Sequence, residues 1–168
     1  MHSAAIRCFI AATMGLLAHA SLAQSMPTTS GETLSGKQIV LAEAVRGRAA
    51  VLVAGFSREG GAATGEWIKQ VRADKALENV SVYQVAMIAG APGFIRGVIR
   101  SGMKKGTPAA QQDYFVVLTE DEALWKNYFN VSTDKEAYVV LIDASGRTLW
   151  RGHGPAANLE PQMKAALR

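Results

Sequence analysis

The sequence predicts an α/β fold: a central mixed sheet flanked by helices, with extra strands at its N-terminal end and a β-hairpin followed by a helix at its C-terminal end. Apolar runs of strand length, such as residues 49–54, lack the alternation of a half-exposed strand and so fit strands buried on both faces. Segments with helical periodicity, such as residues 59–73, separate these runs. The turn composition at residues 143–146 joins two further strands into a hairpin.

The elements follow one another along a single domain. Residues 24–33 are polar, contain proline and serine, and predict a flexible lead-in, so we expect the domain to span residues 34–168. We expect strands at 37–41, 49–54, 80–88, 114–118, 138–142 and 148–151, a polar connection at 43–48, and helices at 59–73, 94–103, 120–129 and 158–167. The order of strand, helix, strand, helix, strand, helix, hairpin and helix implies parallel crossovers with an antiparallel end.

The helix that ends near Phe129 opens on Thr119-Glu120-Asp121-Glu122, which matches a capping box. In a capping box the Thr119 and Glu122 side chains satisfy free amides at the helix start. Acidic residues there also favour the helix dipole. We therefore interpret these carboxylates as helix-start residues and not as a catalytic pair.

Residues 1–23 are predicted to be a removable signal peptide. Arg7 precedes the apolar run 8–18, and Ser21-Leu22-Ala23 offers small residues for cleavage before Gln24. A retained anchor would need about 20 apolar residues, and His19 interrupts the run before that length. A charge directly before Cys8 disfavours lipid attachment. We expect an exported protein, periplasmic if the cell is a Gram-negative bacterium.

The only cysteine of the 168 residues is Cys8, so removal of residues 1–23 leaves no thiol. One histidine, His153, remains beyond that segment, and we expect neither a metal nor a cofactor. We interpret His153 as a solvent-facing loop residue, because no serine or carboxylate is tied to it by the sequence. A net charge of +4 is too mild for dedicated nucleic-acid binding.

Two segments are candidate binding surfaces. Residues 57–61 open a helix directly after a buried strand, where free amides, the helix dipole and Arg58 could hold an anion. The alternative is that Ser57 only caps the helix. Residues 94–105 form a basic amphipathic segment that could hold a partner helix or lie on an anionic membrane. The alternative is a crossover helix whose apolar stripe faces the sheet.

The hypothesis names these partner- or ligand-binding residues: Phe56, Ser57, Arg58, Trp67, Arg96, Arg100, Lys104 and Lys105. Trp67, Trp125 and Trp150 can alternatively be core residues, which is the more common role of tryptophan at such positions.

The order of elements is that of a thioredoxin-like fold with additions, and short motifs resemble a family. The stretch YVVLIDASGRTLWRGHG is similar to one in exported thioredoxin-like proteins. Gly55-Phe56-Ser57 followed by Trp67, and the block IRGVIRSGMKKGTP, resemble the mitochondrial ATPase complex assembly subunit 10 family. The resemblance spans residues 34–167. It implies a thioredoxin-fold chaperone that assists the membrane sector of ATP synthase.

The chain departs from redox thioredoxins at both positions needed for thiol exchange. Phe56-Ser57-Arg58-Glu59 stands where a Cys-x-x-Cys motif would open the first long helix, and Glu136-Ala137-Tyr138 stands where the cis-proline normally lies. Thiol exchange needs a reactive thiolate, so we expect none here. The resemblance also implies a matrix-side location, which differs from the predicted export.

The expected function is therefore that of a non-catalytic binding or assembly factor for an envelope protein complex. Its expected partner is an inner-membrane complex, with membrane-surface contact as a further expectation and nucleic acid excluded. The alternative is a cysteine-independent small-ligand or anion-binding protein, or an enzyme, that uses Ser57 and Arg58.

Overall fold

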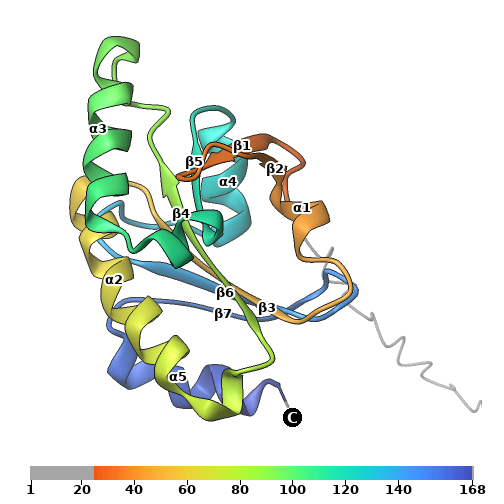
Figure 1. Ribbon diagram of the computed structural model, residues 1–168. Helices are drawn as coiled ribbons and strands as arrows, with labels where there is room; N and C mark the ends of the chain where they lie inside the picture. The colour runs from red at the N-terminus through yellow and green to blue at the C-terminus, as the bar shows by residue number, and fades with distance from the viewer. Residues whose placement is uncertain (1–24, 168) are drawn as a thin grey trace, which may run out of the picture.

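A computed structural model describes residues 25–167, which form one seven-stranded sheet with the strand order β2-β1-β5-β4-β3-β6-β7 (Figure 1). The strands are β1 (Ser30–Thr33), β2 (Gln38–Val40), β3 (Ala50–Gly55), β4 (Ser81–Met87), β5 (Phe115–Leu118), β6 (Tyr138–Ile142) and β7 (Thr148–His153). The helices are α1 (Leu41–Ala44), α2 (Arg58–Ala73), α3 (Gly93–Gly106), α4 (Glu122–Phe129) and α5 (Ala156–Ala165), with short 3₁₀ helices at Lys75–Leu77 and Ala109–Tyr114.

The mixed sheet expected from the sequence is confirmed. Strands β3, β4 and β5 are parallel, whereas β6 pairs antiparallel with β3, and β7 pairs antiparallel with β6. Every residue of β3 is buried, as the unbroken apolar run 49–54 predicts for a strand covered on both faces.

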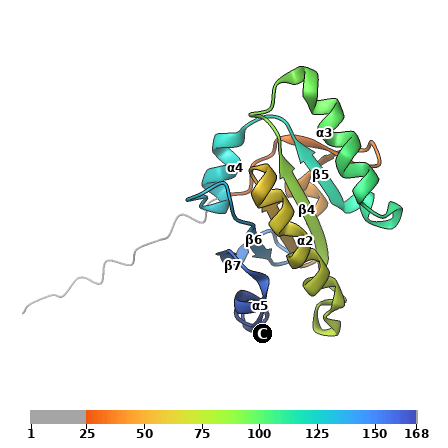
Figure 2. The ribbon, with the colours of Figure 1, turned by 90° about the vertical axis from the view of Figure 1, so that its left-hand side faces the viewer.

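Helices cover both faces of the sheet. Trp125 and Tyr128 of α4 belong to the core on one face, together with Leu41 of α1. Trp67 of α2 and Met163 of α5 belong to the core on the other face. Helix α3 lies on the same side as α2, and Figure 2 shows β4 running between these two helices. A right-handed crossover from β4 to β5 places α3 there.

The folded domain starts earlier than predicted. Residues 30–33, expected to be the end of a flexible lead-in, form β1, which pairs with β5 on one side and with β2 on the other. Thr33 is only 1% exposed. Residues 41–44, part of which we expected to be a polar connection, form the short helix α1, whose Leu41 is fully buried.

The predicted capping box of α4 is wrong. The helix begins at Glu122, so its N-cap is Asp121, which adopts a left-handed conformation with φ of 55° and makes no side-chain cap hydrogen bond. Asp121 Oδ2 instead accepts a hydrogen bond from Thr29 Oγ1 at 2.5 Å. Glu122 pairs with Lys126 one turn later along the helix. Glu122 thus lies in the first turn of α4 as expected, where it forms an ion pair and not a capping box.

The turn between β6 and β7 is held by one carboxylate. Asp143 Oδ1 accepts hydrogen bonds from the Ser145 hydroxyl, the Ser145 amide and the Arg147 amide, and Arg147 Nε donates to Oδ2 at 3.1 Å. These bonds, chiefly the one from the Ser145 hydroxyl, lower the pKa of Asp143 to about 2. Because the charged form is favoured in the folded state, this contribution to stability is complete above about pH 4 and is lost as the pH falls towards 2.

We expect the Asp143 carboxyl to titrate with a midpoint of about 2 in the folded protein, as measured by the chemical shift of its carboxyl carbon. Asp143→Asn serves to assign the signal. This variant should also lose less stability than the wild type between pH 4 and pH 2, since the group that must be protonated is gone. A midpoint near the ordinary value for aspartate would contradict the assigned role of the turn.

Candidate functional site

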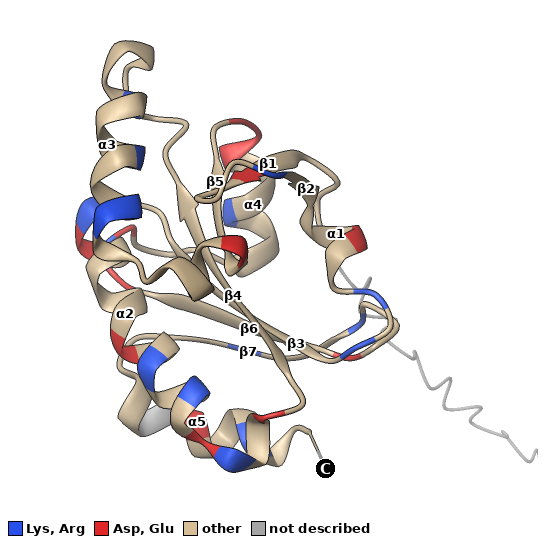
Figure 3. Ribbon diagram, viewed as in Figure 1, with Lys and Arg blue, Asp and Glu red and all other residues tan. Residues whose placement is uncertain are grey.

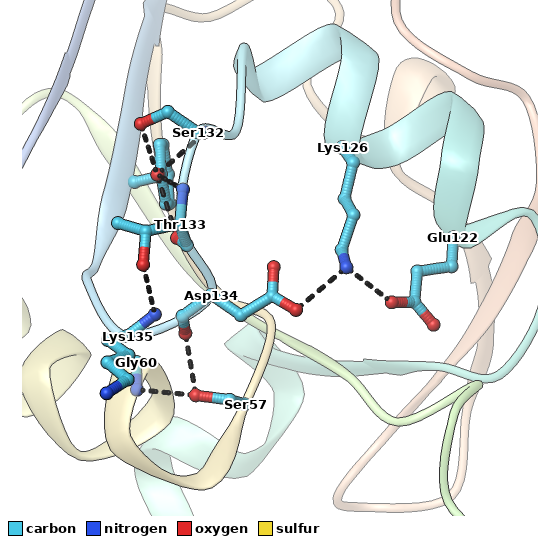
Figure 4. Close-up of polar contacts among 9 residues, drawn as sticks. Ser57, Gly60, Glu122, Lys126, Ser132, Thr133, Asp134 and Lys135 are labelled. Carbon is cyan, nitrogen blue, oxygen red and sulfur yellow. Dashed lines mark hydrogen bonds and ion pairs between the residues drawn. The ribbon is translucent and has the colours of Figure 1, made fainter.

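Ser57 lies at the turn from β3 into α2, and its hydroxyl forms two hydrogen bonds that hold this turn. Its Oγ accepts a hydrogen bond from the Gly60 amide at 3.1 Å and donates one to the Asp134 carbonyl oxygen at 2.6 Å (Figure 4). The capping alternative stated for Ser57 is therefore confirmed. The second bond also fixes the helix start against the loop that precedes β6.

That loop packs closely on the start of α2. A Cβ atom on Gly60 would lie 2.6 Å from the Asp134 carbonyl oxygen and 2.7 Å from that of Glu136. Only glycine permits this approach of two backbone segments. Glu136 and Ala137 occupy the place expected for a cis-proline, and residues 25–167 contain no cis peptide bond.

Side chains around the loop hold it in this position. The Tyr138 hydroxyl accepts hydrogen bonds from the Ser132 and Thr133 amides and donates to the Thr133 carbonyl oxygen. Lys126 bridges the carboxylates of Asp134 and Glu122, each at 2.9 Å (Figure 4). These two bonds, with Asp134 the stronger cause, raise the pKa of Lys126. The position of a thioredoxin active site is thus filled by a hydrogen-bonded network without a thiol.

Two of the predicted contact residues belong to the core. Trp67 is fully buried, and its Nε1 donates to the Gly154 carbonyl oxygen at 2.8 Å. Phe56 is 7% exposed and packs edge-on against Phe129 and Tyr138. The prediction that Trp67 contacts a partner at the surface is therefore wrong, and the core alternative is correct. Trp125 is likewise fully buried.

His153 is exposed as predicted, but it is the last residue of β7 and not a loop residue. Its Nδ1 is 2.5 Å from Glu136 Oε2, and its ring stacks on Tyr138 with 5.3 Å between the centroids. No sequence pattern predicts this pairing, because Glu136 and His153 come together only through the pairing of β6 with β7.

A cleft of about 900 Å³ lies between the start of α2, strand β4 and α3. Apolar residues, among them Ala86, Ile88 and Phe115, contribute to its lining. Arg58 and Glu122 are the charged residues that line it, and Arg58 is exposed. A cleft of this size with a mainly apolar lining is suited to binding a ligand or a polypeptide segment.

Helix α3 forms one wall of this cleft and contains no buried residue. Phe94 is 86% exposed and Val98 is 74% exposed, whereas Met103 packs against Phe115 and its neighbours. The alternative in which the whole apolar stripe faces the sheet is thus wrong. Exposed apolar side chains gathered beside a cleft are typical of a surface that binds another molecule.

Arg96 and Arg100 anchor α3 and are not free surface cations. Arg96 donates to the carbonyl oxygens of Ala91 at 2.8 Å and Ala89 at 2.6 Å. Arg100 donates to the Thr33 carbonyl oxygen at 2.6 Å and forms an ion pair with Glu32 of β1. As partner contacts these two residues are poor candidates, because a partner would have to replace bonds that hold the helix.

Lys104 and Lys105 are exposed in the last turn of α3, where cations also favour the helix dipole. Figure 3 shows Lys and Arg, in blue, along α3. They stay candidates for contact with a partner.

Within residues 25–167 no group of three or more histidine, cysteine, aspartate or glutamate side chains is placed to hold a metal ion. In the same residues no helix has the length and apolar character needed to cross a membrane.

Comparison with solved structures shows the thioredoxin-like fold. A DsbE-type thiol:disulfide interchange protein of Chlorobium tepidum has a TM-score of 0.61 at 18% identity, covering 87% of this chain and 97% of that one. BsSco, of the Sco family of cytochrome c oxidase assembly proteins, has a TM-score of 0.57 at 15% identity, covering 86% and 94%. An SCO1/SenC family lipoprotein of Bacillus anthracis has a TM-score of 0.59 at 14% identity, covering 88% and 97%.

The fold and the site together define a thioredoxin-like protein without a thiol at the position of the usual active site. No curated protein matches the sequence significantly. The family model of the ATP10 protein matches residues 7–166, and the chain belongs to this family. The match confirms the family resemblance drawn from the motifs, and it includes most of the segment predicted to be a signal peptide.

Proposed function

We propose that this protein is a cysteine-independent assembly factor that holds a polypeptide subunit of a membrane protein complex while that complex is built. The observation that carries the proposal is the cleft beside α3, whose mainly apolar lining includes the exposed Val98, one helical turn from the exposed Phe94. Such a surface can hold an apolar polypeptide segment reversibly without any chemical step.

The family and the fold neighbours support an assembly role. The chain belongs to the ATP10 protein family, and the resemblance of its motifs implies help in building the membrane sector of ATP synthase. The Sco family, to which one structural neighbour belongs, consists of cytochrome c oxidase assembly proteins. A thioredoxin-like fold is thus a scaffold on which assembly factors of membrane complexes are built.

The place of action in this proposal is the outer side of the inner membrane, after removal of residues 1–23. Arg7, the apolar run 8–18 and the small residues before Gln24 support export. Removal would also leave the working protein without cysteine. The partner would then be reached through the parts of an inner-membrane complex that face outward.

An anion-binding or enzymatic role at Ser57 and Arg58 has less support. Both hydrogen bonds of the Ser57 hydroxyl go to the backbone of the protein itself, at Gly60 and Asp134. Arg58 is left as a single exposed cation, and reaction sites usually combine several convergent polar groups.

Site-specific crosslinking in the native host tests the proposal. A photo-reactive phenylalanine replaces Val98 in the full chain, produced at its natural level, and captured polypeptides are identified by mass spectrometry. The matched control places the same group at Arg46, an exposed position between α1 and β3. We expect a subunit of one membrane complex to be captured from Val98 and not from Arg46. Equal capture at both positions, or no captured polypeptide, would overturn the proposal.

A further inference from the structure

The cleft beside α3 continues into a second hollow. This hollow has a volume of about 480 Å³, and Gln84, Gly106 and Thr107 line both. The two together form a groove that runs along β4, with α2 on one side and α3 on the other. We call it the α2/α3 groove.

Both walls of the α2/α3 groove present open backbone. On α2, Gly61 and Gly65 lie one turn apart, and on α3, Gly102 and Gly106 do the same. A Cβ atom added to any of these four glycines would meet no atom within 4 Å. The groove is therefore wide enough at each wall for another backbone to approach closely.

The two ends of the groove differ in chemistry. Val98 belongs to the apolar lining at one end, and the exposed Phe94 lies one helical turn before it on α3. At the other end Lys69 and Arg72 of α2 are the charged lining residues, and no acidic residue lines that hollow. Within residues 25–167 neither cation has a carboxylate within ion-pair distance. A basic end on an apolar groove is complementary to an apolar ligand that ends in a carboxylate.

Arg72 lines the basic end of the groove and has no carboxylate partner within residues 25–167. Its side chain is half-buried, and burial lowers its pKa, which means that the protein disfavours its charge. Arginine nevertheless stays protonated at physiological pH. A carboxylate placed in the groove would form charge-assisted hydrogen bonds with the guanidinium and offset the cost of that burial.

We propose that the α2/α3 groove seats an apolar helix of a partner polypeptide and that a carboxylate of this helix pairs with Arg72 and Lys69. A helix suits both the open glycine walls and the exposed side chains of Phe94 and Val98, which a thinner ligand confined to the groove would leave uncovered. A second copy of this chain presenting its own α3 is disfavoured, because α3 carries Arg96, Arg100, Lys104 and Lys105 and no acidic residue. The inference rests on the proposed function and specifies the chemistry of the segment that is held.

The test uses two labelled helical peptides of alanine and leucine that differ at one position near the same end, which is glutamate in one and glutamine in the other. Fluorescence anisotropy measures their binding to the full expressed chain as the cell processes it. We expect the glutamate peptide to bind about tenfold more tightly, because a charge-assisted hydrogen bond is stronger than a neutral one, although solvent weakens it at a half-exposed site. Equal affinity of the two peptides would overturn the proposal.

Variants locate the binding. Arg72→Gln should markedly reduce the difference between the two peptides, and Arg72→Gln combined with Lys69→Gln should remove it, whereas Lys75→Gln, at an exposed cation outside the groove, should preserve it. Gly102→Leu should weaken both peptides at least tenfold by filling the groove, and the open space at Gly102 allows the variant to fold. Unchanged binding to the folded Gly102→Leu variant would contradict the proposed seat.

Two further experimental outcomes would assign the α2/α3 groove to a different occupant and so overturn the proposal. Binding to vesicles of anionic lipid with no binding of either peptide would assign the groove to a membrane surface. Self-association that Gly102→Leu abolishes would assign it to a second copy of the chain. Failure of the peptides while Val98 still captures a polypeptide in cells would overturn this inference and leave the assembly function standing.

Discussion

Replacing Gly60 by alanine is expected to destabilise the protein by about 2–3 kcal/mol, the upper range for overpacking of a tight contact. The added methyl group would lie 2.6 Å from the Asp134 carbonyl oxygen and 2.7 Å from that of Glu136, and neither backbone atom can move without breaking the bonds that hold the loop. The same substitution at the next residue, Gly61, meets open space and should stabilise α2 by about 0.5–1 kcal/mol through the better helix propensity of alanine.

Urea unfolding of the two variants beside the wild type measures this contrast, since a shift of the midpoint at constant slope reports a change in stability. The expected order of midpoints is Gly61→Ala, wild type and Gly60→Ala, from highest to lowest. Similar midpoints for the two variants would show that the loop of residues 134–136 does not lie against the start of α2.

Replacing Trp67 by alanine is expected to cost about 3–5 kcal/mol, the range for removing a large buried aromatic side chain. The indole is fully buried between α2 and the sheet and donates its only hydrogen bond to Gly154, so the substitution leaves both a cavity and an unpaired carbonyl oxygen. This loss is comparable to the whole stability of many domains.

Two control variants accompany Trp67→Ala. Trp67→Phe keeps most of the buried ring and should lose clearly less stability. Leu124→Ala removes a side chain that is 55% exposed and should change stability by no more than about 0.5 kcal/mol. The stability of the three variants is measured by thermal and urea unfolding. Far-ultraviolet circular dichroism follows the unfolding, because its signal comes mainly from the backbone and not from tryptophan. If Trp67→Ala lost no more stability than Leu124→Ala, the assignment of Trp67 to the core would be wrong.

The sheet could be predicted because its central strands are long apolar runs, and the hairpin because Asp143 to Gly146 has the composition of a turn. Strand β1 was missed because Ser-Gly-Glu-Thr has no apolar pattern. It is a strand only through its pairing with β2 and β5, which local sequence does not show. Strand pairing of this kind depends on contacts distant in the chain.

The candidate site was predicted in part. The cap at Ser57 follows from residue type and position, but its second bond joins residues 77 apart, and no periodicity links them. Helical spacing showed that α3 is amphipathic but not that Phe94 and Val98 lie uncovered, because that depends on the neighbouring elements. The sequence does not predict Lys69 and Arg72 as binding residues. A cation without an ion-pair partner can be recognised only when the positions of all its neighbours are known.

The central claim is that the protein supports assembly of a membrane complex without using a thiol. Deleting its gene and separating the membrane complexes on native gels tests this directly, with ATP synthase as the first complex to examine because the family match points to it. The prediction is that one complex fails to accumulate and that the full chain and its Cys8→Ser variant restore it equally. Normal amounts of every membrane complex in the deletion strain, or failure of the Cys8→Ser variant to restore the lost one, would contradict the claim.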